Sequence, residues 1–177
     1  DQDVDSGNKN YTNIEQVVLK NILTNEKYMR KVLPFVKPDY FEGTYKILFK
    51  EAGKFVGKYN KLPTAEAFKI EIDNADSFNE EQYRHAVEII PNLFEEEKAD
   101  ETWLYDSTEK WCQDRALYNA VMESISIIDG KHGTLTKNAL PEILTKALGV
   151  SFDTNVGHDY IENADERYEF YHRDEER

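Results

Sequence analysis

Apolar residues recur every three to four positions along almost the whole chain, and this helical period constrains the fold more than any other feature. Ile14, Val17, Val18 and Ile22 set the pattern, which returns in later segments up to Leu148. Strict alternation of apolar and polar residues, typical of a half-buried strand, is not sustained anywhere. Hydrophobic residues make up 40% of the chain and aromatic residues 12%, enough for a packed core. The sequence therefore predicts an all-α fold.

Helix starts are indicated by side chains that can accept a backbone N–H at the first turn. They precede four periodic segments: Thr12 with Glu15, Asn25, Thr64, and Asn79 with Gln82. The second helix should end before the turn at 36–39, and the third should cover about 42–60. In that third helix we expect these residues to face inward: Tyr45, Leu48, Phe49, Ala52, Phe55, Val56 and Tyr59.

Further along, Tyr83, Ala86, Val87 and Ile90 should form the buried face of a helix that Pro91 ends or kinks. The longest periodic segment covers about 100–128 and is broken at Asp129-Gly130. A shorter helix then begins near Pro141, so the two helices predict a hairpin. The expected organisation is a flexible extension (1–12), a helical body (13–98), a hairpin of the same domain (99–150), and a joint with a linker helix (151–177).

The charge of the chain is uneven. Its 22 basic and 35 acidic residues give a formal net charge of −13, which disfavours domain-wide attraction to nucleic acid. Residues 20–69, however, hold eleven basic and five acidic side chains. Four lysines at four-residue spacing form a lysine stripe on one side of the third helix: Lys46, Lys50, Lys54 and Lys58. The stripe is either a solvated face or a contact for DNA phosphates or an acidic partner.

No pattern for enzyme chemistry is found. Gly53 to Lys58 resembles a phosphate-binding loop, but the spacing is one residue short, Tyr59 replaces the required hydroxyl, and the segment lies within a helix. Cys112 is the single cysteine and should be a buried structural thiol. The four histidines lie far apart, and no apolar run could span a membrane. We expect no catalytic, cofactor-binding or metal-binding residues in these 177 residues.

Two apolar surfaces are candidates for contacts with other chains. A helix of about 28 residues is roughly 42 Å long, longer than a small body needs, so the far end of the hairpin should self-associate. The residues expected there are Val121, Met122, Ile125, Ile128, Ile143 and Leu144. The alternative is that they cover the domain's own core. The second surface is a narrow stripe on the linker helix that should dock on another chain: Tyr160, Ile161, Ala164, Tyr168 and Tyr171.

Several segments together resemble the N-terminal domain of DnaB-type replicative helicases. They are residues 14–23 (IEQVVLKNIL), 36–41 (VKPDYF) and 62–64 (LPT). Further segments resemble the subgroup from T-even-type phages: 108–111 (TEKW), 113–120 (QDRALYNA), 147–153 (ALGVSFD) and 156–160 (VGHDY). The resemblance covers roughly residues 13–171, and its last segment is the most specific.

The resemblance implies a helical collar domain, a linker helix, and then a RecA-like motor that binds ATP and Mg²⁺ and would lie beyond Arg177. Collar domains of this family pair through their hairpins, form a trimer of dimers within a hexamer, and face the primase and the helicase loader. The linker helix docks on the motor of the neighbouring subunit, and DNA is bound mainly by the motor. A phage protein of this kind works in the bacterial cytoplasm.

Two functions of different classes follow. The first is an assembly and docking module of an ATP-driven DNA helicase, itself without enzyme activity. The second is a free-standing helical adaptor or nucleic-acid-binding protein that carries no motor. The reading frame beyond Arg177 distinguishes them, because a Walker motif soon after the linker would support the first and a stop codon the second.

Overall fold

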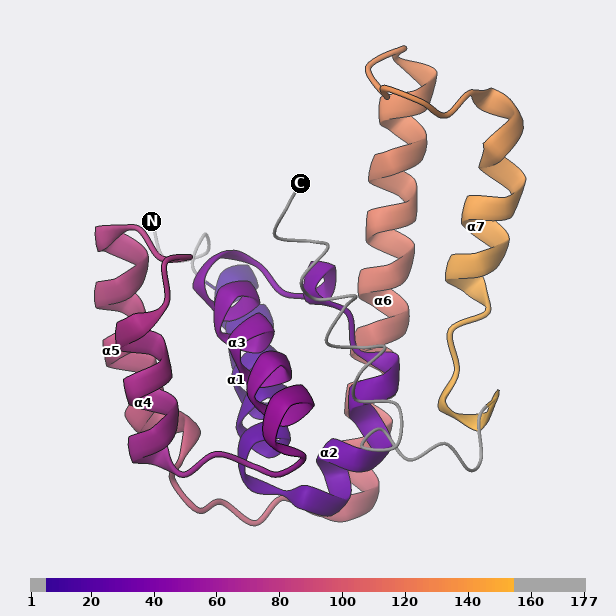
Figure 1. Cartoon of the computed structure of the whole chain (residues 1–177). Helices are drawn as coiled ribbons and strands as arrows, with labels where there is room; N and C mark the ends of the chain where they lie inside the picture. Colours follow the sequence, from indigo (N-terminus) through magenta and orange to yellow (C-terminus); the bar gives the residue numbers. More distant parts are fainter. Residues whose placement is uncertain (1–5, 155–177) are drawn as a thin grey trace. The chain divides into compact units, whose positions relative to one another are not determined.

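A computed structural model of the chain describes the backbone of residues 6–154 and the side chains of residues 14–153. Within this range the chain forms α-helices and short 3₁₀ turns and no β-strand, which confirms the all-α prediction (Figure 1). The α-helices are α1 (Ser6–Thr24), α2 (Glu26–Val32), α3 (Gly43–Tyr59), α4 (Ala65–Asn74), α5 (Glu80–Leu93), α6 (Glu101–Ile128) and α7 (Leu140–Leu148).

The described chain divides between Lys98 and Ala99 into two compact units. The first unit contains α1 to α5, and the second contains α6 and α7. Among the described helices, none combines the length and the apolar character that crossing a bilayer requires.

Three of the predicted helix starts are confirmed by their hydrogen bonds. The side chain of Asn25 accepts from the N–H of Tyr28 at 3.1 Å and begins α2. The hydroxyl of Thr64 accepts the N–H of Ala67 at 3.1 Å and begins α4. Before α5, Asn79 and Gln82 accept each other's backbone N–H at 2.8 and 3.0 Å, which is a complete capping box.

The predicted start of the first helix is wrong. Because α1 already begins at Ser6, Thr12 lies inside the helix and is not its cap. Glu15, the expected partner of Thr12, has another role: its carboxylate accepts the N–H of Glu42 at 3.0 Å. Glu42 is the residue that precedes α3, so a carboxylate of α1 accepts a backbone N–H at the start of α3. A local pattern does not reveal this use, because the two residues are far apart in sequence.

The core of the first unit comes from all five of its helices. α3 packs against α1, α4 and α5, and α1 also packs against α2 and α5. Phe49 of α3 is fully buried, and its ring stacks on Phe41 with the centroids 4.9 Å apart. The largest side chains that are almost completely excluded from solvent are Tyr28, Phe49, Phe68, Leu19, Ile22, Leu23, Met29, Leu33, Leu48, Ile72 and Leu93.

Some aromatic and branched residues that were expected to face inward do not. Tyr59 is exposed at the end of α3, and Phe55 is half-buried against the Tyr59 ring. On α5, Tyr83 and Val87 are exposed, and the buried positions are Ala86, Ile89, Ile90 and Leu93. α5 also continues two residues past Pro91. The period was predicted correctly, but the face that is buried depends on where α3 and α1 lie.

The second unit is a helical hairpin. Asp100 accepts the N–H of Trp103 at 2.9 Å and begins α6, which runs for 28 residues. Gly130 follows the helix end with a φ of 70°, a left-handed conformation that glycine adopts without strain. α7 carries Pro141 in its first turn, as predicted, and packs along the C-terminal half of α6 (Figure 1).

Candidate functional site

One side of α6 carries a continuous row of exposed apolar residues. We call it the α6 stripe and define it as Leu117, Tyr118, Val121, Met122, Ile125 and Ile128. Between 39% and 57% of the surface of each residue is accessible to solvent. These residues do not form the core of their own hairpin.

Most of the α6 residues that pack within the hairpin are smaller than those of the α6 stripe. Ala116, Ala120, Ser124 and Ile127 are buried, and their spacing of three to four residues places them on one face. The hydroxyl of Ser124 donates to the carbonyl of Ala120 at 2.7 Å, so burying it leaves no unsatisfied donor. At about 100° per residue, the centre of this face lies about 120° around the helix from the centre of the α6 stripe. One face of α6 therefore packs against α7. A second face of α6 is not covered by α7.

Ile143 and Leu144 lie on α7 and differ from the α6 stripe in exposure. Both are half-buried, as are Leu140 and Ala147 on the same face, whereas Leu148 at the end of the helix is 72% exposed. Since α7 packs against α6, the half-buried face of α7 is the one directed at α6. Four of the six residues predicted for self-association thus lie on the α6 stripe, and the other two lie on the neighbouring helix.

A histidine orders the loop between the two helices. The Nδ1 atom of His132 accepts the N–H groups of Thr134 and Leu135 at 3.3 and 3.1 Å. Its Nε2 atom lies 3.3 Å from a carboxylate oxygen of Glu123 on α6. Because Nδ1 accepts hydrogen bonds, the proton is on Nε2, where it is donated to Glu123. His132 therefore anchors the loop to α6.

The lysine stripe is partly neutralised by neighbouring carboxylates. Lys46 forms an ion pair with Asp39 at 2.8 Å, and Lys54 forms one with the buried Glu51 at 3.3 Å. The hydroxyl of Ser77 also donates to Glu51, at 3.2 Å. Lys50 and Lys54 line an open polar hollow of about 600 Å³ whose wall also contains Glu51, Glu71 and Asp76. The stripe is thus a surface of mixed charge around Lys50 and Lys54, and Lys58 lies exposed beside the Tyr59 ring.

Reversing the charges of Lys50 and Lys58 tests whether the stripe binds phosphates. We expect the Lys50→Glu and Lys58→Glu double variant to bind single-stranded DNA more weakly, with a flatter dependence on salt. Its free energy of unfolding should change by less than about 1 kcal/mol, because Lys58 is exposed and Lys50 is half-buried at the wall of an open hollow. Binding is measured by fluorescence anisotropy over a salt series, and stability by denaturant unfolding.

The matched control is the Lys61→Glu and Lys69→Glu double variant, which makes the same change of charge at exposed positions off the stripe. Lys54 is left unchanged because a carboxylate there would face Glu51. Equal DNA binding by both double variants would leave the stripe as a solvated face.

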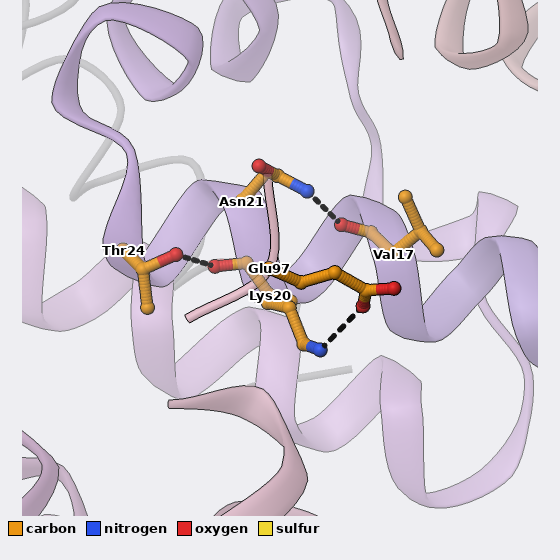
Figure 2. A network of polar contacts seen from close by, with 5 residues as sticks. All are labelled: Val17, Lys20, Asn21, Thr24 and Glu97. Atoms are coloured by element: carbon orange, nitrogen blue, oxygen red, sulfur yellow. Dashed lines mark hydrogen bonds and ion pairs between the residues drawn. The ribbon is translucent and has the colours of Figure 1, made fainter. Parts of the chain in front are cut away.

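A buried lysine of α1 is held by a glutamate that precedes α6. The side chain of Lys20 is 9% exposed, and its Nζ lies 3.1 Å from Oε2 of Glu97 (Figure 2). In the same turn, Asn21 donates to the carbonyl of Val17 at 2.8 Å, and Thr24 donates to the carbonyl of Lys20 at 2.7 Å. The side chain of Glu97 is mostly exposed, so the ion pair lies at the surface of the first unit. The pair fixes the end of this unit to α1, and its role is structural.

Reactive groups are few among the described residues. Cys112 is buried, and burial together with the nearby Glu109 carboxylate raises the pKa of its thiol, so the thiol stays protonated and unreactive. No group of three side chains in residues 14–153 could hold a metal ion. Gly53 and Gly57 are buried within α3, where no phosphate could be wrapped by a loop. The predicted docking residues of the linker helix, Tyr160 to Tyr171, lie outside the described residues.

No family model matches the chain. The chain is 31% identical over 165 residues to a DnaB-like replicative helicase of Enterobacteria phage T4. This similarity covers 88% of the present chain and 34% of the relative. The chain therefore spans about a third of the length of the protein that it matches.

Proposed function

We propose that the chain is the assembly and docking module of a phage replicative helicase and so has a role in DNA replication, because 88% of it is similar to a DnaB-like replicative helicase. In this proposal the hairpins pair subunits, and the pairs build a hexamer as a trimer of dimers. The module also presents surfaces to the primase and the helicase loader in the cytoplasm of the bacterial host. Unwinding belongs to a motor domain outside these residues, which binds ATP, Mg²⁺ and most of the DNA.

The observation that carries the proposal is the α6 stripe. A hairpin of two helices has a small surface, and an uncovered apolar row along half of a helix of about 42 Å is a large part of it. Isolated exposed apolar residues are common on proteins and need no partner. Six of them in one row, on the face away from α7, are typical of a surface that another copy covers.

In this proposal the described residues have no enzyme activity of their own. The buried thiol is protonated, no cluster of metal ligands is present in residues 14–153, and the glycine-lysine segment of α3 is helical. In the proposed assembly this chain supplies contacts between subunits and determines how the subunits are arranged. The hydrolysis of ATP is assigned to the motor of the parent protein.

Sedimentation of the chain tests the proposal. We expect a dimer at micromolar concentrations that dissociates on dilution, because a stripe of this size buries enough apolar surface for moderate affinity. The weight-average mass is measured by sedimentation equilibrium at several concentrations. A second measurement follows the fluorescence of Trp103, which is 50% exposed on the same helix. A monomeric mass at every accessible concentration would contradict the proposal.

A further inference from the structure

The chain that leaves α7 turns back to α6. The end of α7 is closed by hydrogen bonds from the N–H groups of Gly149 to the carbonyl of Thr145, at 3.1 Å, and of Val150 to the carbonyl of Ala147, at 3.4 Å. Two side chains of α6 then hold the backbone that follows. Nε2 of Gln113 donates to the carbonyl of Val150 at 3.0 Å, and Oε2 of Glu109 accepts the N–H of Phe152 at 2.7 Å.

We propose that Glu109 and Gln113 are positioning residues that fix the point at which the chain leaves the hairpin. We call these two side chains the α6 bracket. Nothing in the pairing of hairpins requires them, since they are not part of the α6 stripe. Their role in the proposal is to hold residues 150–152 against the N-terminal half of α6, so that the following residues start from a defined place.

The two members of the bracket have opposite hydrogen-bonding polarity and therefore pair with different backbone groups. Glu109 and Gln113 are four residues apart and so lie on the same face of α6, one turn above the other. The glutamate offers only an acceptor, and the amide nitrogen of Gln113 is a donor. They match an N–H at position 152 and a carbonyl at position 150. Each member of the bracket therefore has a partner of the complementary type within residues 150–152.

The strength of the bracket comes mainly from Glu109. A hydrogen bond to a carboxylate is shorter and stronger than one between neutral groups, and the 2.7 Å distance agrees with this. Glu109, Ser151 and Phe152 are all half-buried, so water competes less well for the N–H of Phe152 than it would on an open surface. Gln113 is exposed, so its hydrogen bond contributes less stability. Its main effect is to orient the carbonyl of Val150.

The position of the bracket also separates the departing chain from the α6 stripe. Glu109 and Gln113 continue the face of Ala116, Ala120 and Ser124, which lies about 120° around the helix from the centre of the stripe. The bracket is centred about 14 residues before Ile125, or roughly 21 Å along the helix axis. Residues 150–152 therefore leave the stripe uncovered for a second copy.

Amide hydrogen exchange of Phe152 tests the bracket directly, with the whole chain in solution. In the Glu109→Ala variant we expect the Phe152 amide to exchange about tenfold faster or more, because its acceptor is lost. Glu109→Gln keeps an acceptor oxygen without the charge, so the exchange rate should lie between those of the parent chain and Glu109→Ala. The control is Asp114→Ala, which removes an exposed carboxylate from the next turn of α6 and should leave Phe152 unchanged.

A distance measurement tests the consequence for the chain. Spin labels are placed on cysteines introduced at the exposed positions 106 and 153, and Cys112 can remain because it is buried and protonated. We expect one narrow distance distribution in the parent chain and a broad one in the Glu109→Ala, Gln113→Ala variant. Protection of Ala120 and Ser124 amides in α6 reports whether the hairpin itself remains folded.

Equal exchange of Phe152 in Glu109→Ala and the parent chain would overturn the proposal, as would a broad distance distribution in the parent chain. Faster exchange along the whole of α6 would also overturn it, since the residue would then support the hairpin and not the exit point. The exchange readout does not depend on self-association, and the distances are measured on labelled chain diluted into unlabelled chain so that inter-subunit label pairs do not contribute. A failure of the bracket is therefore distinguishable from a failure of the proposed assembly function.

Discussion

Replacing Val121 and Ile125 together by aspartate is expected to convert the self-associated chain into a monomer. Both residues are exposed, at 42% and 45%, so the hairpin should still fold. In a dimer built on the α6 stripe, however, four carboxylates would be buried without partners, and each costs several kcal/mol. The dissociation constant should increase by at least about 100-fold, which corresponds to about 2.8 kcal/mol. Sedimentation equilibrium measures the change.

The matched control replaces two exposed apolar residues of the first unit, Ile70 and Val87, by aspartate. It makes the same change of charge and hydrophobicity away from α6, and we expect it to dimerise like the parent chain. Circular dichroism shows whether each variant keeps its helices. If the Val121→Asp, Ile125→Asp variant remains a dimer, or the control dissociates equally, the α6 stripe is not the self-association surface.

Truncating Phe49 to alanine should give the largest loss of stability. The ring is fully buried in α3 and stacks on Phe41, so its removal leaves a cavity where α3 meets the other helices of the first unit. Such a change costs about 3–5 kcal/mol in the free energy of unfolding, a large part of the stability of a domain this small. Denaturant unfolding followed by circular dichroism should show a much lower midpoint.

Phe55→Ala is the control for this prediction, because Phe55 lies on the same helix but is only half-buried. Its loss should cost roughly 1 kcal/mol, from the smaller area removed from contact. Equal midpoints for the two variants would contradict the assignment of Phe49 to the core. The comparison isolates burial, since both variants remove the same ring from the same helix.

The sequence by itself determined the helices and most of their ends. Asn25, Thr64 and the pair Asn79 and Gln82 cap helices that begin where predicted, because a cap is a contact between residues two or three apart. The hairpin also follows from local signals, since Asp129-Gly130 ends α6 and Pro141 begins α7. Four residues of the α6 stripe could be named from their apolar character and from the length of the helix, whereas Leu117 and Tyr118 were added by their exposure in the structure.

Only the tertiary structure decided which side chains of those helices are buried and which form hydrogen bonds with distant segments. Glu15 accepts an N–H of Glu42 and is not part of a cap, and Tyr83 is exposed although it lies in an apolar period. The hairpin packs through Ala116, Ala120 and Ser124, while the larger apolar residues of α6 face outward. Period and propensity are properties of neighbouring residues, whereas burial depends on which other helix approaches. The contact of Glu109 with Phe152 joins residues 43 positions apart, so only the folded chain shows it.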